Sequence, residues 1–226
     1  MPDDSDRFRL QVVSEALRLF SEQGYEATSV DEIADAAGIS RRTFFRQFRS
    51  KEDVVFADHE ILLEQASQFL GADHPDPWGA VCDAATIVFE RFADWEDVAT
   101  RRYAVVHRVP ALRDREIVTG YRYERLFVEY LRRALPDSAD LARVQFAASV
   151  IATHNYLLRR MVRDGVETTS QELRTALAEI RHGIDRAGVD GGRDEDVVVA
   201  VFPRGLAPRR VADLVQRRLE ARDHGR

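Results

Sequence analysis

The sequence has one cysteine, one lysine and no long uncharged stretch. Because Cys82 has no second cysteine to pair with, an intramolecular disulfide is excluded and a reducing compartment is favoured. The longest stretch without a charged side chain, Val144 to Leu158, is too short and too polar to span a bilayer. The acidic start, MPDDSDR, is not followed by an apolar run, which excludes an ordinary secretory signal. We therefore expect a cytoplasmic protein with no membrane partner.

Common catalytic and cofactor motifs are also absent. The chain contains no G-x-S-x-G elbow, no G-x-G-x-x-G, no P-loop and no H-E-x-x-H. Its six histidines do not show the spacing of metal ligands. Cys82 lies in an apolar helical stretch, which is more typical of a small buried residue than of a nucleophile. We expect no enzyme activity, no metal site and no cofactor.

The hydrophobic pattern predicts an all-α protein. At 226 residues the chain can form one large domain or two small ones, and its apolar content of 45% suffices for a core. The exception is VVVAVF at 197–202, which suits a strand or a buried extended segment. Helical spacing of apolar residues covers 8–22, 51–70, 77–94, 96–109, 111–135, 140–163 and 170–186.

Three serines mark helix starts between residues 28 and 53. Ser29 followed by Glu32 fits a capping box, in which each side chain bonds a free backbone amide of the first turn. Ser40 and Ser50 are placed to cap two further helices. Helix, tight turn and helix over about 29–48 have the spacing of a DNA-binding helix-turn-helix.

The turn and its charge support this interpretation. Gly38 can adopt the left-handed conformation that ends a helix. Whereas the whole chain carries a net charge of −6, the segment from Gly38 to Lys51 has five basic side chains and no acid. Such a patch attracts phosphate. A solvated, arginine-rich helix end would have the same composition, but the caps and the interleaved aromatics favour DNA binding. Of these aromatics we expect Phe44 and Phe48 in the core and Phe45 exposed.

The stretch from Gly24-Tyr25-Glu26-Ala27-Thr28-Ser29-Val30 through Ile33-Ala34 to GISRRTFFRQFRSKED resembles the N-terminal domain of TetR-family transcriptional repressors. The resemblance covers about the first 60 residues. It implies a helix-turn-helix domain at 6–66, joined by a long helix to a helical effector-binding and dimerisation domain at 67–187. The extension at 188–226 lies beyond the usual end of the family and has no assigned role. Many members carry Tyr where this chain has Phe45, whose ring cannot donate a hydrogen bond to a phosphate but can pack against the sugar-phosphate edge.

The predicted DNA contacts divide into two groups. Donors on Arg41, Arg42 and Gln47 match the edges of guanine or adenine in the major groove. Thr43 lies on the same short recognition helix. Contacts to the DNA backbone are expected from five further residues, Thr28, Ser40, Phe45, Arg46 and Lys51.

An effector pocket is expected in the aromatic-rich region between Pro77 and Met161, where polar groups interrupt apolar helices. Each aromatic there is equally suited to a plain core. Regulators that are similar over SRRTFFR-x-F-x-SK include some that respond to fatty acyl thioesters, which suggests a lipid-like effector. The candidate pocket residues are Phe89, Phe92, His107, Tyr121, Phe127 and His154.

The helix predicted at 140–163 is apolar on two sides, so a second subunit is expected to cover one of them. Asn155 lies within the outer seam, where it either fixes the register of two subunits or faces its own interior. The candidate dimer contacts are Leu141, Val144, Ala148, Ile151, Asn155 and Leu158 on this helix, and Leu173, Leu177, Ile180 and Ile184 on the next.

Together these features predict a homodimeric repressor that a small molecule releases from a palindromic double-stranded operator. Two alternatives remain open at this point. One is a helical enzyme or carrier that uses the C-terminal pocket, and the other is a constitutive DNA-binding module without an effector.

Overall fold

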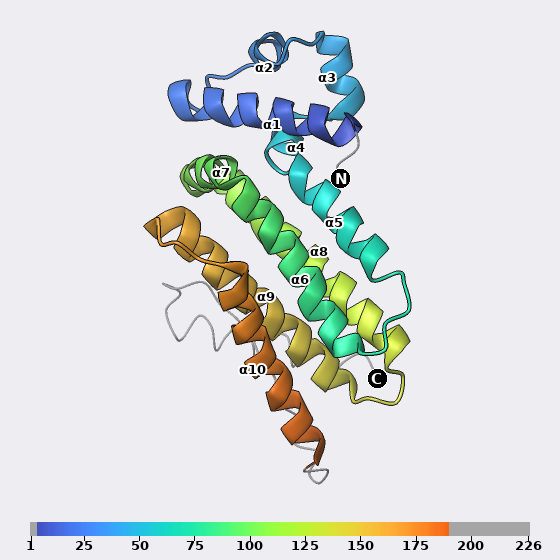
Figure 1. The fold of residues 1–226 in the computed structure, drawn as a ribbon. Helices are drawn as coiled ribbons and strands as arrows, with labels where there is room; N and C mark the ends of the chain where they lie inside the picture. Colours follow the sequence, from blue (N-terminus) through green and yellow to red (C-terminus); the bar gives the residue numbers. More distant parts are fainter. Residues whose placement is uncertain (1–3, 190–226) are drawn as a thin grey trace, which may run out of the picture. The chain divides into compact units, whose positions relative to one another are not determined.

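The computed structural model describes residues 4–189, which form α-helices and contain no strand (Figure 1). The predicted all-α fold, an N-terminal helix-turn-helix domain followed by a helical bundle, is confirmed. None of the helices in this range combines the length and the apolar composition that a membrane span requires. The segment 197–202, predicted as a strand, and the rest of 190–226 lie outside the described residues. The N-terminal helices are α1 (Asp4–Gln23), α2 (Val30–Ala36), α3 (Arg41–Gln47), α4 (Lys51–Val55) and α5 (Ala57–Phe69).

The C-terminal bundle follows the predicted periodicity to within a few residues. Its first helix begins at Pro77 behind an Asp76 cap, and its fourth ends at Gly165, which adopts a left-handed conformation. These ends match the preference for Pro at a helix start and Gly just after a helix end. The helices are α6 (Pro77–Asp94), α7 (Glu96–Arg108), α8 (Pro110–Ala134), α9 (Asp140–Asp164) and α10 (Ser170–Val189).

The first four helices share one apolar core. Phe44 and Phe48 are buried in it, at 0% and 2% exposure, whereas Phe45 is 45% exposed. The predicted placement of these three rings is therefore confirmed. Val105 and Val106 of α7 belong to the same core, and α7 lies beside α1 (Figure 1). The DNA-binding helices thus pack directly on a helix of the C-terminal bundle.

The long helix expected from Lys51 to Leu70 is interrupted at Phe56, whose backbone leaves the helical region at φ −114° and ψ 12°. Val54 and Val55 before the break face the N-terminal core. By contrast, Leu62 after the break packs against α6, α8 and α9 in a second core. The break at Phe56 changes the direction of the chain. As a result, the apolar side of α4 faces the N-terminal core and the apolar side of α5 faces the core of the C-terminal bundle.

One face of α9 lies in the interior of its own subunit. Phe146, Val150 and Leu157 are buried there. On α10, Leu173 and Leu177 pack into the same core at 0% and 1% exposure. The prediction that these two leucines contact a second subunit is therefore wrong, because a single subunit already covers them completely.

Candidate nucleic-acid interface and effector site

The recognition helix α3 is anchored on one side and exposed on the other. Ser40 caps it, since the Ser40 side chain accepts a hydrogen bond from the Thr43 amide at 3.1 Å. Phe44 inserts into the core and fixes the rotation of the helix about its axis. Arg42 and Arg46 consequently project from the opposite side, and both are exposed. Neither forms an ion pair within the described residues, so both cations can reach a phosphate or a base edge.

Arg41 has partners within the protein. Its Nη1 donates to both carboxylate oxygens of Asp31 on α2, at 2.5 and 2.6 Å. Its guanidinium also lies over the exposed Phe45 ring, 5.2 Å from the centroid. The Asp31 carboxylate on α2 is therefore paired with a cation. A base contact from Arg41 requires it to leave Asp31, whereas Arg42 needs no such exchange.

The structure gives Thr28 and Lys51 internal partners. The Thr28 side chain is buried and its hydroxyl donates to the Gly24 carbonyl at 2.8 Å. Lys51 Nζ donates to the Tyr25 carbonyl at 2.8 Å and lies 4.2 Å from the centroid of the Tyr25 ring. The Thr28 side chain therefore closes the loop between α1 and α2 on itself, and Lys51 holds this loop against α4. A phosphate contact from either would require some of these internal bonds to be exchanged.

Gln47 and Thr43 are half-buried on α3. The Thr43 hydroxyl is 2.9 Å from the hydroxyl of Ser40, which already caps the helix. Of the three predicted base-reading residues, Arg42 is therefore the one that is exposed and has no ion pair among residues 4–189.

The predicted effector residues separate into a buried group and an exposed group. Phe89, Phe92 and Phe127 are buried, and His154 is buried against the first two, with ring centroids 5.7 and 6.4 Å apart. His107 is exposed and bonds the carbonyl of its own helix one turn earlier.

Tyr121 is 63% exposed on α8. Helical spacing placed Tyr121 and His107 correctly on helices but on the wrong faces. The prediction that they join His154 in one pocket is therefore corrected.

A buried polar cluster lies beside His154, and sequence reasoning missed most of it. Asp58 of α5 is fully buried and forms an ion pair with Arg102 of α7. Arg102 also donates to His59 Nε2 at 2.9 Å, and the Tyr123 hydroxyl donates to the His59 carbonyl at 3.3 Å. One signal was present in the sequence, because Asp58 interrupts the apolar stripe of the 51–70 segment at a helical position.

Burial keeps both imidazoles of this region neutral. It lowers the pKa of His154 to about 4, since the imidazolium form loses its hydration there. The pKa of His59 is lowered by burial and by the adjacent Arg102 cation. Because Arg102 donates to Nε2 of His59, the proton of this neutral ring lies on Nδ1. At neutral pH the cluster therefore offers uncharged imidazole groups next to one internal ion pair.

Several polar atoms of the cluster have no hydrogen-bond partner among the described residues. They are Arg102 Nε, His59 Nδ1 and His154 Nε2. The three side chains surround the Phe92 ring, at centroid distances of 5.4 Å for the Arg102 guanidinium, 5.0 Å for His59 and 6.4 Å for His154. Small-molecule sites typically combine aromatic surface with a few polar atoms that are free to bond the ligand. Here Arg102 Nε and His59 Nδ1 are free donors and His154 Nε2 is a free acceptor among the described residues.

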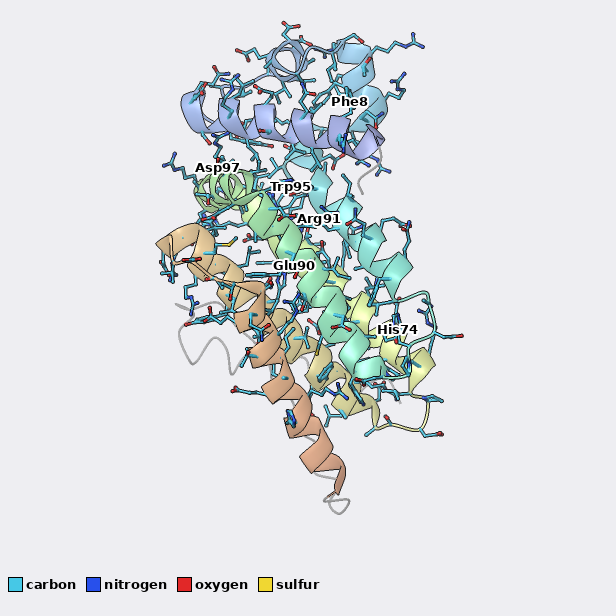
Figure 2. The ribbon with its side chains drawn as sticks, viewed as in Figure 1. Phe8, His74, Glu90, Arg91, Trp95 and Asp97 are labelled. Carbon is cyan, nitrogen blue, oxygen red and sulfur yellow. The ribbon has the colours of Figure 1, made fainter. Side chains whose placement is uncertain are left out.

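A surface hollow of about 340 Å³ lies elsewhere, between the start of α6 and the outer side of α10. It is lined by His74, which is in the loop before α6 (Figure 2), and by Cys82 and Arg181. None of the six predicted effector residues lines it. Burial raises the pKa of the Cys82 thiol to about 12, so the group is protonated and not a nucleophile at neutral pH.

Comparison with known proteins agrees with the geometry of α2 and α3. Residues 12–57 match the model described as bacterial regulatory proteins, tetR family. The HTH-type transcriptional regulator TcmR of Streptomyces glaucescens is 35% identical over 151 residues, which cover 61% of this chain and 58% of that protein. The aligned part therefore spans somewhat more than half of TcmR.

Solved structures share the fold across most of the chain. A TetR-family transcriptional regulator from Syntrophomonas wolfei superposes with a TM-score of 0.61 at 16% identity, covering 80% of this chain and 97% of that one. SmeT, in a complex with triclosan, gives a TM-score of 0.58 at 16% identity and covers 88% of this chain and 100% of that one. The capped helix-turn-helix, the match over residues 12–57 and the similarity to TcmR together identify the N-terminal part of the chain as the DNA-binding domain of a TetR-family transcriptional regulator, and the solved structures share the fold of the bundle that follows.

Proposed function

We propose that the chain is a homodimeric repressor that binds a palindromic operator through α3 and leaves it when a small molecule binds. The observation that carries this proposal is the orientation of α3. Phe44 anchors its inner side, and Arg42 and Arg46 are exposed on its outer side, with no ion pair to any side chain in the part of the chain that the structure describes. An exposed basic helix that is rigidly capped fits the major groove of DNA.

In this proposal α3 lies in the major groove, and Arg42 reads a base edge together with Gln47. Arg46 and the α3 start at Ser40 contact the phosphates. Arg41 joins the base contacts once it exchanges Asp31 for DNA, so its contribution is smaller than that of Arg42. Specific affinity for the operator then depends most on Arg42, which has no ion pair among residues 4–189 to exchange for DNA.

The second subunit binds on the outer side of α9. Leu141 and Tyr156 are 38% and 65% exposed there. Ala148 and Asn155 between them are half-exposed, which leaves apolar surface and one amide for a partner to cover. Val144, Ile151, Leu158 and Ile180 also pack partly on their own subunit, so their share of the contact is smaller. Two-fold symmetry of the dimer predicts operator half-sites about 34–36 Å apart, or a related spacing.

Ile184 completes the set of proposed dimer contacts. The described backbone of α10 includes it, and its side chain lies outside the described part.

The effector binds where Phe92 now fills the space between His59, Arg102 and His154. An apolar molecule with one polar head, such as a lipid-like compound or an acyl thioester, would use the aromatic surface and the unused hydrogen-bonding atoms. SmeT, which shares the fold, forms a complex with triclosan, and this supports a small-molecule ligand for this chain.

The signal has a short path, because α7 carries Arg102 at the effector site and Val105 in the core of the DNA-binding helices. The effector acts only if it binds one arrangement of α7 better than the other.

The test is a gel shift with DNA from upstream of the protein's own gene. The dimer should retard this DNA in the presence of excess random DNA, and a lipid extract or a long-chain acyl thioester should release it. Equal retardation of both DNAs would refute the repressor. Release that also occurs in a His154→Phe variant, in which the polar acceptor is missing, would place the effector elsewhere.

A constitutive DNA-binding module is the second candidate. The observation in its favour is that Phe89, Phe92 and Phe127 fill the bundle interior. Operator binding that no extract or acyl thioester changes would favour it.

A further inference from the structure

The break at Phe56 separates two parts with different attachments. On its N-terminal side, α4 follows the recognition helix and packs with the DNA-binding core. On its C-terminal side, α5 packs within the C-terminal bundle. Because the backbone of Phe56 leaves the helical conformation, the angle between α4 and α5 depends on the side-chain contacts around the break.

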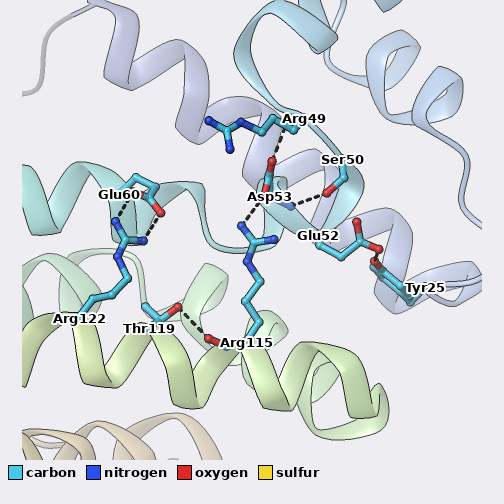
Figure 3. A network of polar contacts seen from close by, with 9 residues as sticks. All are labelled: Tyr25, Arg49, Ser50, Glu52, Asp53, Glu60, Arg115, Thr119 and Arg122. Atoms are coloured by element: carbon cyan, nitrogen blue, oxygen red, sulfur yellow. Dashed lines mark hydrogen bonds and ion pairs between the residues drawn. The ribbon is translucent and has the colours of Figure 1, made fainter.

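Two arginines of α8 form ion pairs with carboxylates on opposite sides of the break (Figure 3). Arg115 forms an ion pair with Asp53 of α4, and Arg122 forms a two-pronged ion pair with Glu60 of α5. In both pairs the partners are 62 positions apart in the sequence, so α8 runs alongside α4 and α5 in a constant register. Of the two pairs, that of Arg115 crosses from the C-terminal bundle to the DNA-binding side of the break.

Asp53 connects the Arg115 ion pair to the turn after the recognition helix. Its Oδ2 accepts a hydrogen bond from the Arg49 amide at 3.0 Å, and its own amide donates to the Ser50 hydroxyl at 3.2 Å (Figure 3). One carboxylate thus joins Arg115 to the turn that follows α3. The Arg115 guanidinium also lies over the Phe56 ring, 5.7 Å from its centroid. Arg115 therefore touches the break itself and the turn beyond it.

We infer that Arg115 is a positioning residue for operator binding. Its ion pair with Asp53 sets the angle between α4 and α5 at Phe56, and that angle sets the direction of α3. The inference rests on the proposed DNA-binding function. The apolar core that α1 shares with α7 also joins the two parts, and the Arg115 ion pair adds a directional contact to α4 at the break itself. The Arg122 pair holds α8 to α5 whatever the angle at the break.

Exposure argues against a mainly stabilising role for either pair. The Arg115 and Asp53 side chains are 38% and 22% exposed, and those of Arg122 and Glu60 are 39% and 42% exposed. Ion pairs at such sites add little to folding stability. Without the Arg115 pair, we expect a folded protein whose recognition helices sample a wider range of directions, of which a smaller fraction fits the operator.

The test compares Arg115→Gln with the matched control Arg122→Gln, which removes the same charge from the same helix. Dissociation constants are measured for the protein's own upstream DNA and for random DNA of equal length, across a salt series. Arg115→Gln should weaken operator binding by roughly two- to thirtyfold, the range expected for a coupling residue. Its affinity for random DNA and its salt slope should stay those of the control, because nonspecific binding depends on phosphate contacts. Arg115→Lys should recover part of the loss.

Amide hydrogen exchange supplies a measurement that does not need DNA. Arg115→Gln should speed exchange in residues 49–57 relative to Arg122→Gln and to the unchanged protein. Equal operator losses in both variants, or an Arg115→Gln loss that is the same on random DNA, would overturn the positioning role. If the unchanged protein does not distinguish the two DNAs, the proposed function fails. In that case unchanged exchange at 49–57 would show that the Arg115 contact does not hold the break either.

Discussion

The helix-turn-helix and the centre of the C-terminal bundle use polar side chains in opposite ways. In the first region the helix caps are local and exposed, as in the reciprocal bonds between Ser29 and Glu32. In the second they are long-range and buried. Arg102 reaches back 44 positions to a fully buried Asp58, and Tyr123 reaches 64 positions back to His59.

This difference predicts how substitutions in each region affect the protein. A local cap can be lost at small cost, because water replaces the missing partner at an exposed helix end. Loss of one member of a buried pair leaves a charge without water or partner. We therefore expect substitutions in the buried cluster to affect folding most, and substitutions on α3 to affect DNA recognition most. Four experiments test this difference between the two regions.

The largest effect is expected from Arg102→Met. It leaves the buried Asp58 carboxylate without its cation, which should lower the free energy of unfolding by about 3–5 kcal/mol. Urea unfolding measures the change. The double variant Arg102→Met with Asp58→Leu removes both charges and should recover most of the stability. A single variant as stable as the unchanged protein would show that this pair is not isolated from water.

The second effect is a loss of stability in acid. His154 has an ordinary pKa of 6.5 and a folded-state pKa of about 4. Below pH 6.5 the unfolded chain binds a proton that the folded chain rejects, so stability should fall as the pH drops from 6.5 towards 4. Near pH 4 the loss due to His154 should be on the order of 3 kcal/mol.

The measurement is the difference in unfolding free energy between the unchanged protein and His154→Phe, taken at several pH values. Carboxyl groups titrate in both proteins and cancel in the difference. His59, whose pKa is also lowered, contributes in the same direction to both. A difference that does not change with pH would mean that His154 is not in a water-poor site.

The third effect concerns recognition rather than folding. Arg42→Ala should cost about 1–3 kcal/mol of operator affinity, mostly at one base pair, with the unfolding free energy nearly unchanged. Fluorescence anisotropy with single-base operator variants measures it. Arg41→Ala serves as the comparison and should cost less, because Arg41 gives up its Asp31 contact on binding. Equal losses for Arg42→Ala on operator and on random DNA would contradict base reading.

The smallest effect is expected at the exposed cap. Ser29→Ala removes the acceptor for the Glu32 amide and should lower the unfolding free energy by about 1 kcal/mol. Thermal unfolding at fixed protein concentration measures the shift. A loss as large as that of Arg102→Met would mean that the two regions do not differ in the way proposed here.

Much of the fold and part of the site were predictable. The first residues of α6 and α10 follow from Pro77 and from the apolar spacing after Ser170. Phe44 and Phe45 were assigned correctly to opposite sides of α3. Other predictions were wrong, because a periodic pattern shows which side of a helix is apolar but not which element packs against that side. Leu173 faces its own subunit's core, and Tyr121 faces outward instead of towards His154.

The features that depend on residues a few positions apart can be predicted from the sequence. These are the caps, the turn at Gly38, the helix periods and the basic recognition helix. The tertiary structure alone decided the pairing of Asp58 with Arg102, the break at Phe56 and the reach of Arg115 to Asp53. The physical reason is distance along the chain. A cap closes a loop of three residues, whereas these pairs form only after two cores have packed and brought distant helices together.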